Sequence, residues 1–137
     1  MSILIDTNFL LAMTFPKDSN YWKAHEAMRD LKEKRVIVAP VLPEVFFMIA
    51  SRMNYSAAVR FFKMLQSAAF QIEPLTTEDM IRMSEIMAVY EDNAFDFVDV
   101  SIMALSERLN ITDVYTFDRR DFTVFRPKHC VSLLLFP

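Results

Sequence analysis

ILIDTN, residues 3–8, is a short apolar run that ends in an acidic residue, and VYTFDRRDF, residues 114–122, repeats this arrangement late in the chain. Both apolar runs are typical of strands in a parallel sheet, which are buried on both faces. Asp6 and Asp118 then follow the carboxyl ends of their strands, the edge where open α/β sheets bind ligands. The two stretches predict an α/β fold with an acidic site at one edge of its sheet.

Between these two runs, apolar strands alternate with helical segments, and no dipeptide typical of a β-hairpin separates them. This order predicts a three-layer sandwich in which a five-stranded parallel sheet is flanked by helices. Asn8, Ser56, Thr77 and Asp96 are suited to cap helices, and Pro43 suits a first helical turn. We expect strands at 3–5, 36–38, 70–72, 114–117 and 131–135, and helices at 9–15, 21–34, 43–52, 57–68, 77–90 and 97–109.

Glycine is absent from the sequence. Its absence excludes a Walker A loop, a dinucleotide-binding fingerprint and the glycine-rich loop of protein kinases. Turns that need a positive φ must then use other residues, and Asn or Asp tolerate that conformation best. Asn54, Asn93 and Asn110 fall between the expected elements, so we expect them to serve in these turns.

Length and composition indicate one domain, residues 1–137, because 53% hydrophobic residues supply one sizeable core. The net charge of −3 does not exclude a nucleic-acid partner, since neutralising the few acids of a metal site leaves the charge of the remaining surface nearly balanced.

Cys130 is the only cysteine, which fits a reducing compartment. No apolar stretch approaches the length of a membrane span. We therefore expect a cytoplasmic protein with no membrane partner.

Two further acids, Glu44 in VLPEVFF and Asp99 in DFVDVSIMAL, lie near the starts of helical patterns. Helix starts share the sheet edge at which Asp6 and Asp118 are expected. Four carboxylates gathered there cannot all stay ionised without cations, and oxygen ligands favour Mg²⁺ or Mn²⁺. A metal site of this kind beside a phosphodiester is hydrolytic. The acids therefore indicate a metal-dependent nuclease.

At these residues the sequence resembles the PIN-domain nucleases, and within them the VapC-type toxins of toxin–antitoxin pairs. The resemblance covers nearly the whole chain. It implies a PIN-like fold, Mg²⁺- or Mn²⁺-dependent cleavage of RNA, frequent homodimers and inhibition by a cognate antitoxin protein. The matching motifs are DTN at 6–8, PE at 43–44, FVDVSIMALSERLNI at 97–111 and TFDRRDF at 116–122.

The resemblance also implies roles for individual residues. Asp6, Glu44, Asp99 and Asp118 match the four catalytic acids of the family, with Asp6, Asp99 and Asp118 as metal ligands. Glu44 then either binds a second ion or orients the attacking water. Thr116 matches a hydroxyl residue that orients the site.

Several neighbouring residues have two readings. Asp96 either only caps the helix of Asp99 or supports the site from one turn away. Asp121 competes with Asp118 for the fourth acidic role, and we favour Asp118 because it directly follows the strand. Thr7, like Asn8 and Thr116, is expected to support the site without reacting. Arg119 and Arg120, beside Asp118, belong to either a solvated loop or a rim that contacts RNA phosphates.

The sequence is also compatible with, or can be tested against, functions other than a toxin nuclease. A phosphatase or phosphorylated receiver domain with Asp6 as nucleophile lacks support, because no second acid stands two residues on and no Lys directly follows the fourth strand. The remaining alternatives share the fold. They are an RNA-processing PIN nuclease without an antitoxin, and a catalytically idle PIN scaffold that acts as a binding module.

Overall fold

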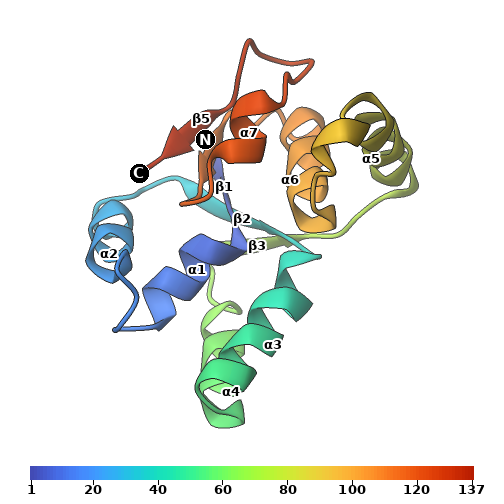
Figure 1. Ribbon diagram of the computed structural model, residues 1–137. Helices are drawn as coiled ribbons and strands as arrows, with labels where there is room; N and C mark the ends of the chain where they lie inside the picture. Colours follow the sequence, from blue (N-terminus) through green and yellow to red (C-terminus); the bar gives the residue numbers. More distant parts are fainter.

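A single parallel sheet forms the centre of the computed structural model, which describes residues 1–137 (Figure 1). Its strand order is β3-β2-β1-β4-β5, and every neighbouring pair is parallel, as predicted. The central strands are almost wholly buried because helices cover both faces. The strands are β1 (Ser2–Ile5), β2 (Lys34–Val38), β3 (Phe70–Glu73), β4 (Asp113–Tyr115) and β5 (Leu134–Phe136).

The helices form two layers, one on each face of the sheet (Figure 1). Crossovers between parallel strands are right-handed, so those from β1 to β2 and from β2 to β3 place α1 to α4 on one face. The crossover from β3 to β4 runs the other way and places α5 and α6 on the opposite face. No helix combines the length and apolar character needed to cross a lipid bilayer. The helices are α1 (Thr7–Thr14), α2 (Tyr21–Arg29), α3 (Val41–Arg52), α4 (Tyr55–Met64), α5 (Thr77–Val89), the 3₁₀ turn η1 (Glu91–Asn93), α6 (Phe97–Arg108) and α7 (Arg120–Val124).

The strand order reverses direction between β1 and β4. The chain leaves β1 for β2 on one side, whereas β4 pairs with β1 on the other side. Ile5 lies opposite Tyr115, and the backbone N–H of Asp6 donates to the carbonyl of Tyr115 at 3.0 Å. Reversal points of this kind leave a crevice at the carboxyl ends of the strands, where open α/β sheets bind ligands. The fold therefore brings the residues after β1 and β4 to one crevice.

Helix α2 ends at Arg29, five residues earlier than expected. Lys34 instead begins β2, because this segment pairs with β1 and β3. The Arg35 guanidinium reaches back and donates to the carbonyls of Met28 at 3.3 Å and Leu31 at 3.4 Å. A basic side chain thus satisfies the end of α2, but from the next strand rather than from within the helix. The sheet pairing decides where α2 stops.

Three expected helix caps were wrong by one or two residues. Asp6 rather than Asn8 caps α1, Asn54 rather than Ser56 caps α4, and Thr76 rather than Thr77 caps α5. In each case the earlier polar residue has extended backbone and accepts an N–H of the first turn, which is the geometry of a cap. Asp96 caps α6 as predicted.

The two positive φ values belong to Asn110, at 54°, and Ala94, at 50°. Asn110 follows α6 and takes the left-handed position that glycine usually occupies, as predicted. The expectations for Asn54 and Asn93 were wrong, since Asn54 is an extended helix cap and Ala94 closes the η1 turn instead of Asn93. Two further differences lie near the chain end: α7 was not predicted, and β5 begins at Leu134, where pairing with Asp113 starts.

Candidate active site

Asp6 is held at the carboxyl end of β1 with only 3% of its surface exposed. Its Oδ1 accepts the backbone N–H of Thr7 at 2.8 Å, which is the capping bond of α1. Its Oδ2 accepts the hydroxyl of Thr116 at 2.9 Å and the amide of Asn8 at 3.1 Å. Both carboxylate oxygens are therefore fixed before any ligand arrives.

Asn8 and Thr116 connect Asp6 to the loop that follows β4. The Asn8 side-chain carbonyl accepts the backbone N–H of Phe117 at 2.8 Å, and the Thr116 hydroxyl oxygen accepts that of Asp118 at 3.1 Å. Asn8 has thus no capping role; it joins the first turn of α1 to β4. These bonds place Asp118 beside Asp6 although the two residues are far apart in the sequence.

Helix α6 carries Asp99 in its first turn, with 9% of the residue exposed. Asp96 caps this helix by accepting the backbone N–H of Val98 at 2.9 Å. Asp96 also lines the same cavity as Asp99, so it both caps α6 and lies at the site. Glu44, half-buried, enters from the first turn of α3.

A cavity of about 130 Å³ gathers the predicted acids. All four acids lie on its wall, together with Asp96, Thr7 and Asn8, while Thr116 lies behind Asp6 and contacts it. Two apolar residues that the sequence did not single out, Leu11 and Met48, complete the wall. The lining residues are Asp6, Thr7, Asn8, Leu11, Glu44, Met48, Asp96, Asp99 and Asp118.

Burial raises the pKa of two of these acids. The pKa of Asp6 is raised to about 6, mainly by desolvation, although its bonds from Thr116 and Thr7 oppose the shift. The pKa of Asp99 is raised to about 8, again first by desolvation and then by the nearby charges of Asp6 and Asp96. Carboxyl groups in this state bind protons near neutral pH, and a cation can take the place of those protons.

The donor set of the cavity fits a hard divalent cation. Every charged group on its wall is a carboxylate, and Mg²⁺ prefers carboxylate oxygens while keeping several waters. The volume admits such waters, since a water occupies roughly 30 Å³ in the liquid. The Thr7 hydroxyl is buried without a hydrogen-bond partner, so it is free to bond one of them. No three Asp, Glu, His or Cys side chains lie close enough together to hold a metal ion by themselves, so a bound ion would need waters among its ligands.

Asp118 and Asp121, the two candidates for the fourth acid, differ in position. Asp118 is exposed and lies on the cavity wall, whereas Asp121 is 8% exposed in α7 and is absent from the wall. Asp121 pairs with Arg120 at 3.3 Å and still contributes to the raised pKa of Asp99. The cavity therefore favours Asp118 for direct contact with a ligand and Asp121 for an indirect electrostatic effect.

The two arginines after Asp118 point to different neighbours. Arg120 pairs with Asp121, while Arg119 donates to the carbonyl oxygens of Leu135 and Pro137. Arg119 also lines a second cavity, together with Lys23 and Phe117. No sequence pattern predicts that Lys23 and Phe117 line one cavity, because their proximity depends on how α2 packs beside the loop after β4.

Thr116→Val is expected to weaken divalent-metal binding and catalysis by about 10- to 100-fold, the usual effect of losing a residue that orients a metal ligand. Valine keeps the buried volume but removes the hydroxyl that bonds Asp6. The measurement is the Mg²⁺ concentration that half-saturates the thermal shift. Ser106→Ala, which removes a buried hydroxyl bonded to Met103, is the matched control. Equal Mg²⁺ midpoints in both variants would show that Thr116 does not orient Asp6.

The parallel sheet, its reversal point and the acidic cavity define an open α/β domain with an acidic site at the carboxyl ends of its strands. Residues 3–126 match the family model for the PIN domain, so the chain belongs to the PIN domain family. The resemblance predicted from the four motifs is therefore confirmed.

Within this family, the chain is similar to VapC toxins. It is 22% identical over 125 residues to Ribonuclease VapC26 of Mycobacterium tuberculosis, a match that covers 91% of this chain and 93% of that protein. Its fold matches the crystal structure of VapC20 from Mycobacterium tuberculosis, described as a sarcin-ricin loop cleaving toxin, with a TM-score of 0.84, 22% identity, and coverage of 94% of this chain and 98% of that one. It also matches VapBC2 of Rickettsia felis, bound to a DNA fragment from its promoter, with a TM-score of 0.72, 14% identity, and 98% and 97% coverage.

Proposed function

We propose that this protein is a divalent-metal-dependent endoribonuclease, residues 1–137 forming one nuclease domain, and the toxin of a toxin–antitoxin pair. The observation that carries the proposal is the cavity in which Asp6 and Asp99 have raised pKa values among further carboxylates. Similarity to Ribonuclease VapC26 supports RNA as the substrate, and we expect the protein to act in the cytoplasm.

Asp6, Asp99 and Asp118 are the residues that hold Mg²⁺ or Mn²⁺ in this proposal. When bound, the ion supplies positive charge to the phosphate and lowers the pKa of a water. Glu44, which lines the cavity from the first turn of α3, either binds a second ion or orients the attacking water. Thr116 and Asn8 keep the Asp6 carboxylate in one orientation throughout. The products are expected to carry a 5′-phosphate and a 3′-hydroxyl.

An antitoxin is the expected protein partner. A mainly apolar cavity of about 320 Å³ lies between α1, α2 and α4, where an amphipathic helix of a partner can bury its apolar face. An Arg or Lys of the same partner that reaches the acidic cavity replaces the charge of the ion and blocks phosphate entry. Solved VapBC complexes with similar folds support this assignment. The lining residues are Met13, Thr14, His25, Met53, Ala57, Arg60, Phe61 and Met64.

Expression of this chain alone is expected to arrest growth of the host cell, whereas co-expression with the protein encoded by the adjacent open reading frame restores growth. The reason is that an unblocked acidic cavity leaves the nuclease active on cellular RNA. The measurement is colony formation together with copurification of the partner. The Asp99→Asn chain, which lacks a proposed metal ligand, is the control and is expected to be harmless.

Other outcomes would support the alternatives. Harmless expression of a chain that cuts RNA when purified, with no copurifying partner, indicates an RNA-processing PIN nuclease without an antitoxin. A chain that neither binds divalent ions nor cuts RNA indicates an idle PIN scaffold that acts as a binding module.

A homodimer is expected because large apolar side chains of α3 and α4 remain exposed. Phe47 is 70% exposed and Tyr55 is 68% exposed, and Phe62 adds to the same pair of helices. Contiguous apolar surface of this kind usually marks a contact between subunits.

Light scattering should give a mass twice the 16.0 kDa of one chain. Phe47→Ser should lower the measured mass, whereas Val131→Ser, at another exposed apolar residue, should leave it unchanged. A mass of one chain at micromolar concentration contradicts the dimer.

A further inference from the structure

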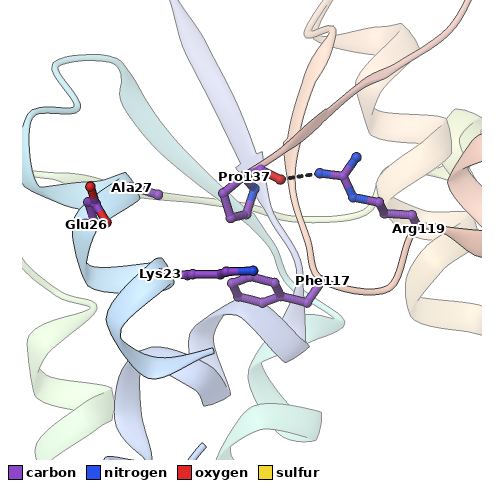
Figure 2. Close-up of a pocket in the computed structure, with 6 residues that line it drawn as sticks. All are labelled: Lys23, Glu26, Ala27, Phe117, Arg119 and Pro137. Carbon is purple, nitrogen blue, oxygen red and sulfur yellow. Dashed lines mark hydrogen bonds between the residues drawn. The ribbon is translucent and has the colours of Figure 1, made fainter. Parts of the chain in front are cut away.

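A second cavity, of about 460 Å³, lies between α2 and the loop that follows β4 (Figure 2). Helix α2 forms one wall with Lys23, Glu26 and Ala27, and the loop after β4 forms the other with Phe117 and Arg119, while Pro137 closes one end. Its volume falls within the roughly 300–1,000 Å³ of small-molecule sites. We call this cavity the α2 groove.

The α2 groove combines an aromatic surface with two cations. Lys23 extends from α2 toward the Phe117 ring, and Arg119 points from the loop after β4 toward Pro137 (Figure 2). Lys23 forms no ion pair in the structure. Arg119 uses one nitrogen, Nη2, for Leu135 and Pro137, which leaves its other N–H groups available. Glu26 is the only acidic side chain on the wall, against the two basic side chains of Lys23 and Arg119.

The Phe117 ring is held in place by a stacking contact and by a bond to its backbone. It stacks on the buried ring of Phe9, with centroids 5.3 Å apart and planes 10° apart, and its backbone N–H is held by Asn8. Phe117 stands between Thr116, which bonds Asp6, and Asp118, which lines the acidic cavity. A ligand lying on Phe117 is therefore next to the acidic cavity.

A third hollow, of about 520 Å³, continues along α2. It shares Glu26 with the α2 groove and is lined by Trp22, His25, Met28 and Arg29. Trp22 is 77% exposed, so its ring is accessible to a ligand. Two successive hollows with an aromatic and a basic side chain each follow the pattern of single-stranded nucleic-acid sites, in which bases stack and cations contact phosphates.

We propose that the α2 groove binds the nucleotide of single-stranded RNA next to the scissile phosphate, with Lys23 and Arg119 contacting a phosphate and Phe117 stacking against a base. The strand then continues across Glu26 to Trp22. Glu26 opposes binding, because it places a carboxylate beside the phosphate path. This inference rests on the proposed ribonuclease function and adds the residues that position the substrate.

Removing a positive charge and removing a negative charge from α2 should change RNA binding in opposite directions, and this tests the proposal. Fluorescence anisotropy with a short labelled single-stranded RNA of mixed sequence, in EDTA, measures binding without cleavage. Lys23→Gln should weaken binding about three- to tenfold and reduce the slope of log affinity against log salt by about 0.7. Glu26→Gln should tighten binding about two- to fivefold, and Trp22→Leu should weaken it by at least about fivefold. Lys32→Gln, at an exposed lysine before β2 and so at the other edge of the sheet, is the control.

Kinetics separate this inference from the proposed function. In Mn²⁺, Lys23→Gln should raise KM for RNA and leave kcat unchanged, because Lys23 positions the substrate without contacting the acidic cavity. If the unmodified chain cuts RNA while Lys23→Gln and Glu26→Gln bind RNA with its affinity and salt dependence, the α2 groove is not an RNA site. If the unmodified chain fails to cut RNA in Mn²⁺, the proposed function is wrong, whatever the binding results.

Discussion

Asp99→Asn is expected to lower the rate of RNA cleavage by more than about 100-fold, because loss of a residue that merely orients a metal ligand already costs 10- to 100-fold. Asparagine keeps the shape of the side chain but removes a charge that holds the ion. Asp99 is well placed for this role, since it is 9% exposed and lines the cavity shared with Asp6. The measurement is single-turnover cleavage of a labelled RNA in Mn²⁺.

The matched control is Asp92→Asn, at an exposed acid in the η1 turn that does not line the cavity. Its cleavage rate should equal that of the unmodified chain. Circular dichroism of both variants verifies that the fold is retained. A normal cleavage rate in folded Asp99→Asn would remove Asp99 from the catalytic machinery.

The second large effect concerns the metal-free protein, whose thermal stability should fall as pH rises from about 5 to 8.5. The pKa of Asp99 is about 8 in the folded chain, against 3.8 as its ordinary value, so the folded state holds this proton more tightly than the unfolded state. The stability that Asp99 contributes is therefore complete below its ordinary pKa and is lost as pH rises through about 8. Asp6, with a pKa of about 6, adds a loss in the same direction.

Asp99→Asn should remove most of this pH dependence and raise the melting temperature in EDTA at pH 8 by at least about 3 °C. Added Mg²⁺ should then stabilise the unmodified chain more than the variant, since only the former retains the full ligand set. The control is Asp30→Asn, at an exposed acid directly after α2 that does not line the cavity. A lower melting temperature for Asp99→Asn than for the unmodified chain would mean that its carboxylate is not destabilised by its neighbours.

The sheet and the acidic cavity were predictable because they depend on patterns that survive in a single sequence. ILIDTN and VYTFD carry both the apolar strand and the acid at its end, and parallel sheets place such ends at one edge. Asp99 follows a correctly predicted cap at Asp96, so its place in the first turn of α6 was also predictable. The motif order along the chain was then enough to indicate the PIN family.

The features that could not be predicted depend on tertiary contacts. Asn8 is polar and stands at a helix start, so it resembles a cap, yet its side chain bonds Phe117 across the site. The end of α2 is decided by the pairing of β2 and by Arg35, which no helical pattern describes. The α2 groove brings Lys23 together with Phe117 and Arg119, which are far from it in the sequence, so no local motif predicts this contact.

Divalent-metal dependence of RNA cleavage by the unmodified chain is the most direct test of the acidic cavity. The purified protein, stripped with EDTA, is incubated with single-stranded RNA, and Mg²⁺ or Mn²⁺ is then added in excess. We expect no cleavage in EDTA and full recovery with either ion, giving products with 5′-phosphate ends. Cleavage that persists in EDTA would contradict the account, because the carboxylates of Asp6, Asp99 and Asp118 have no hydrolytic role in it without a cation.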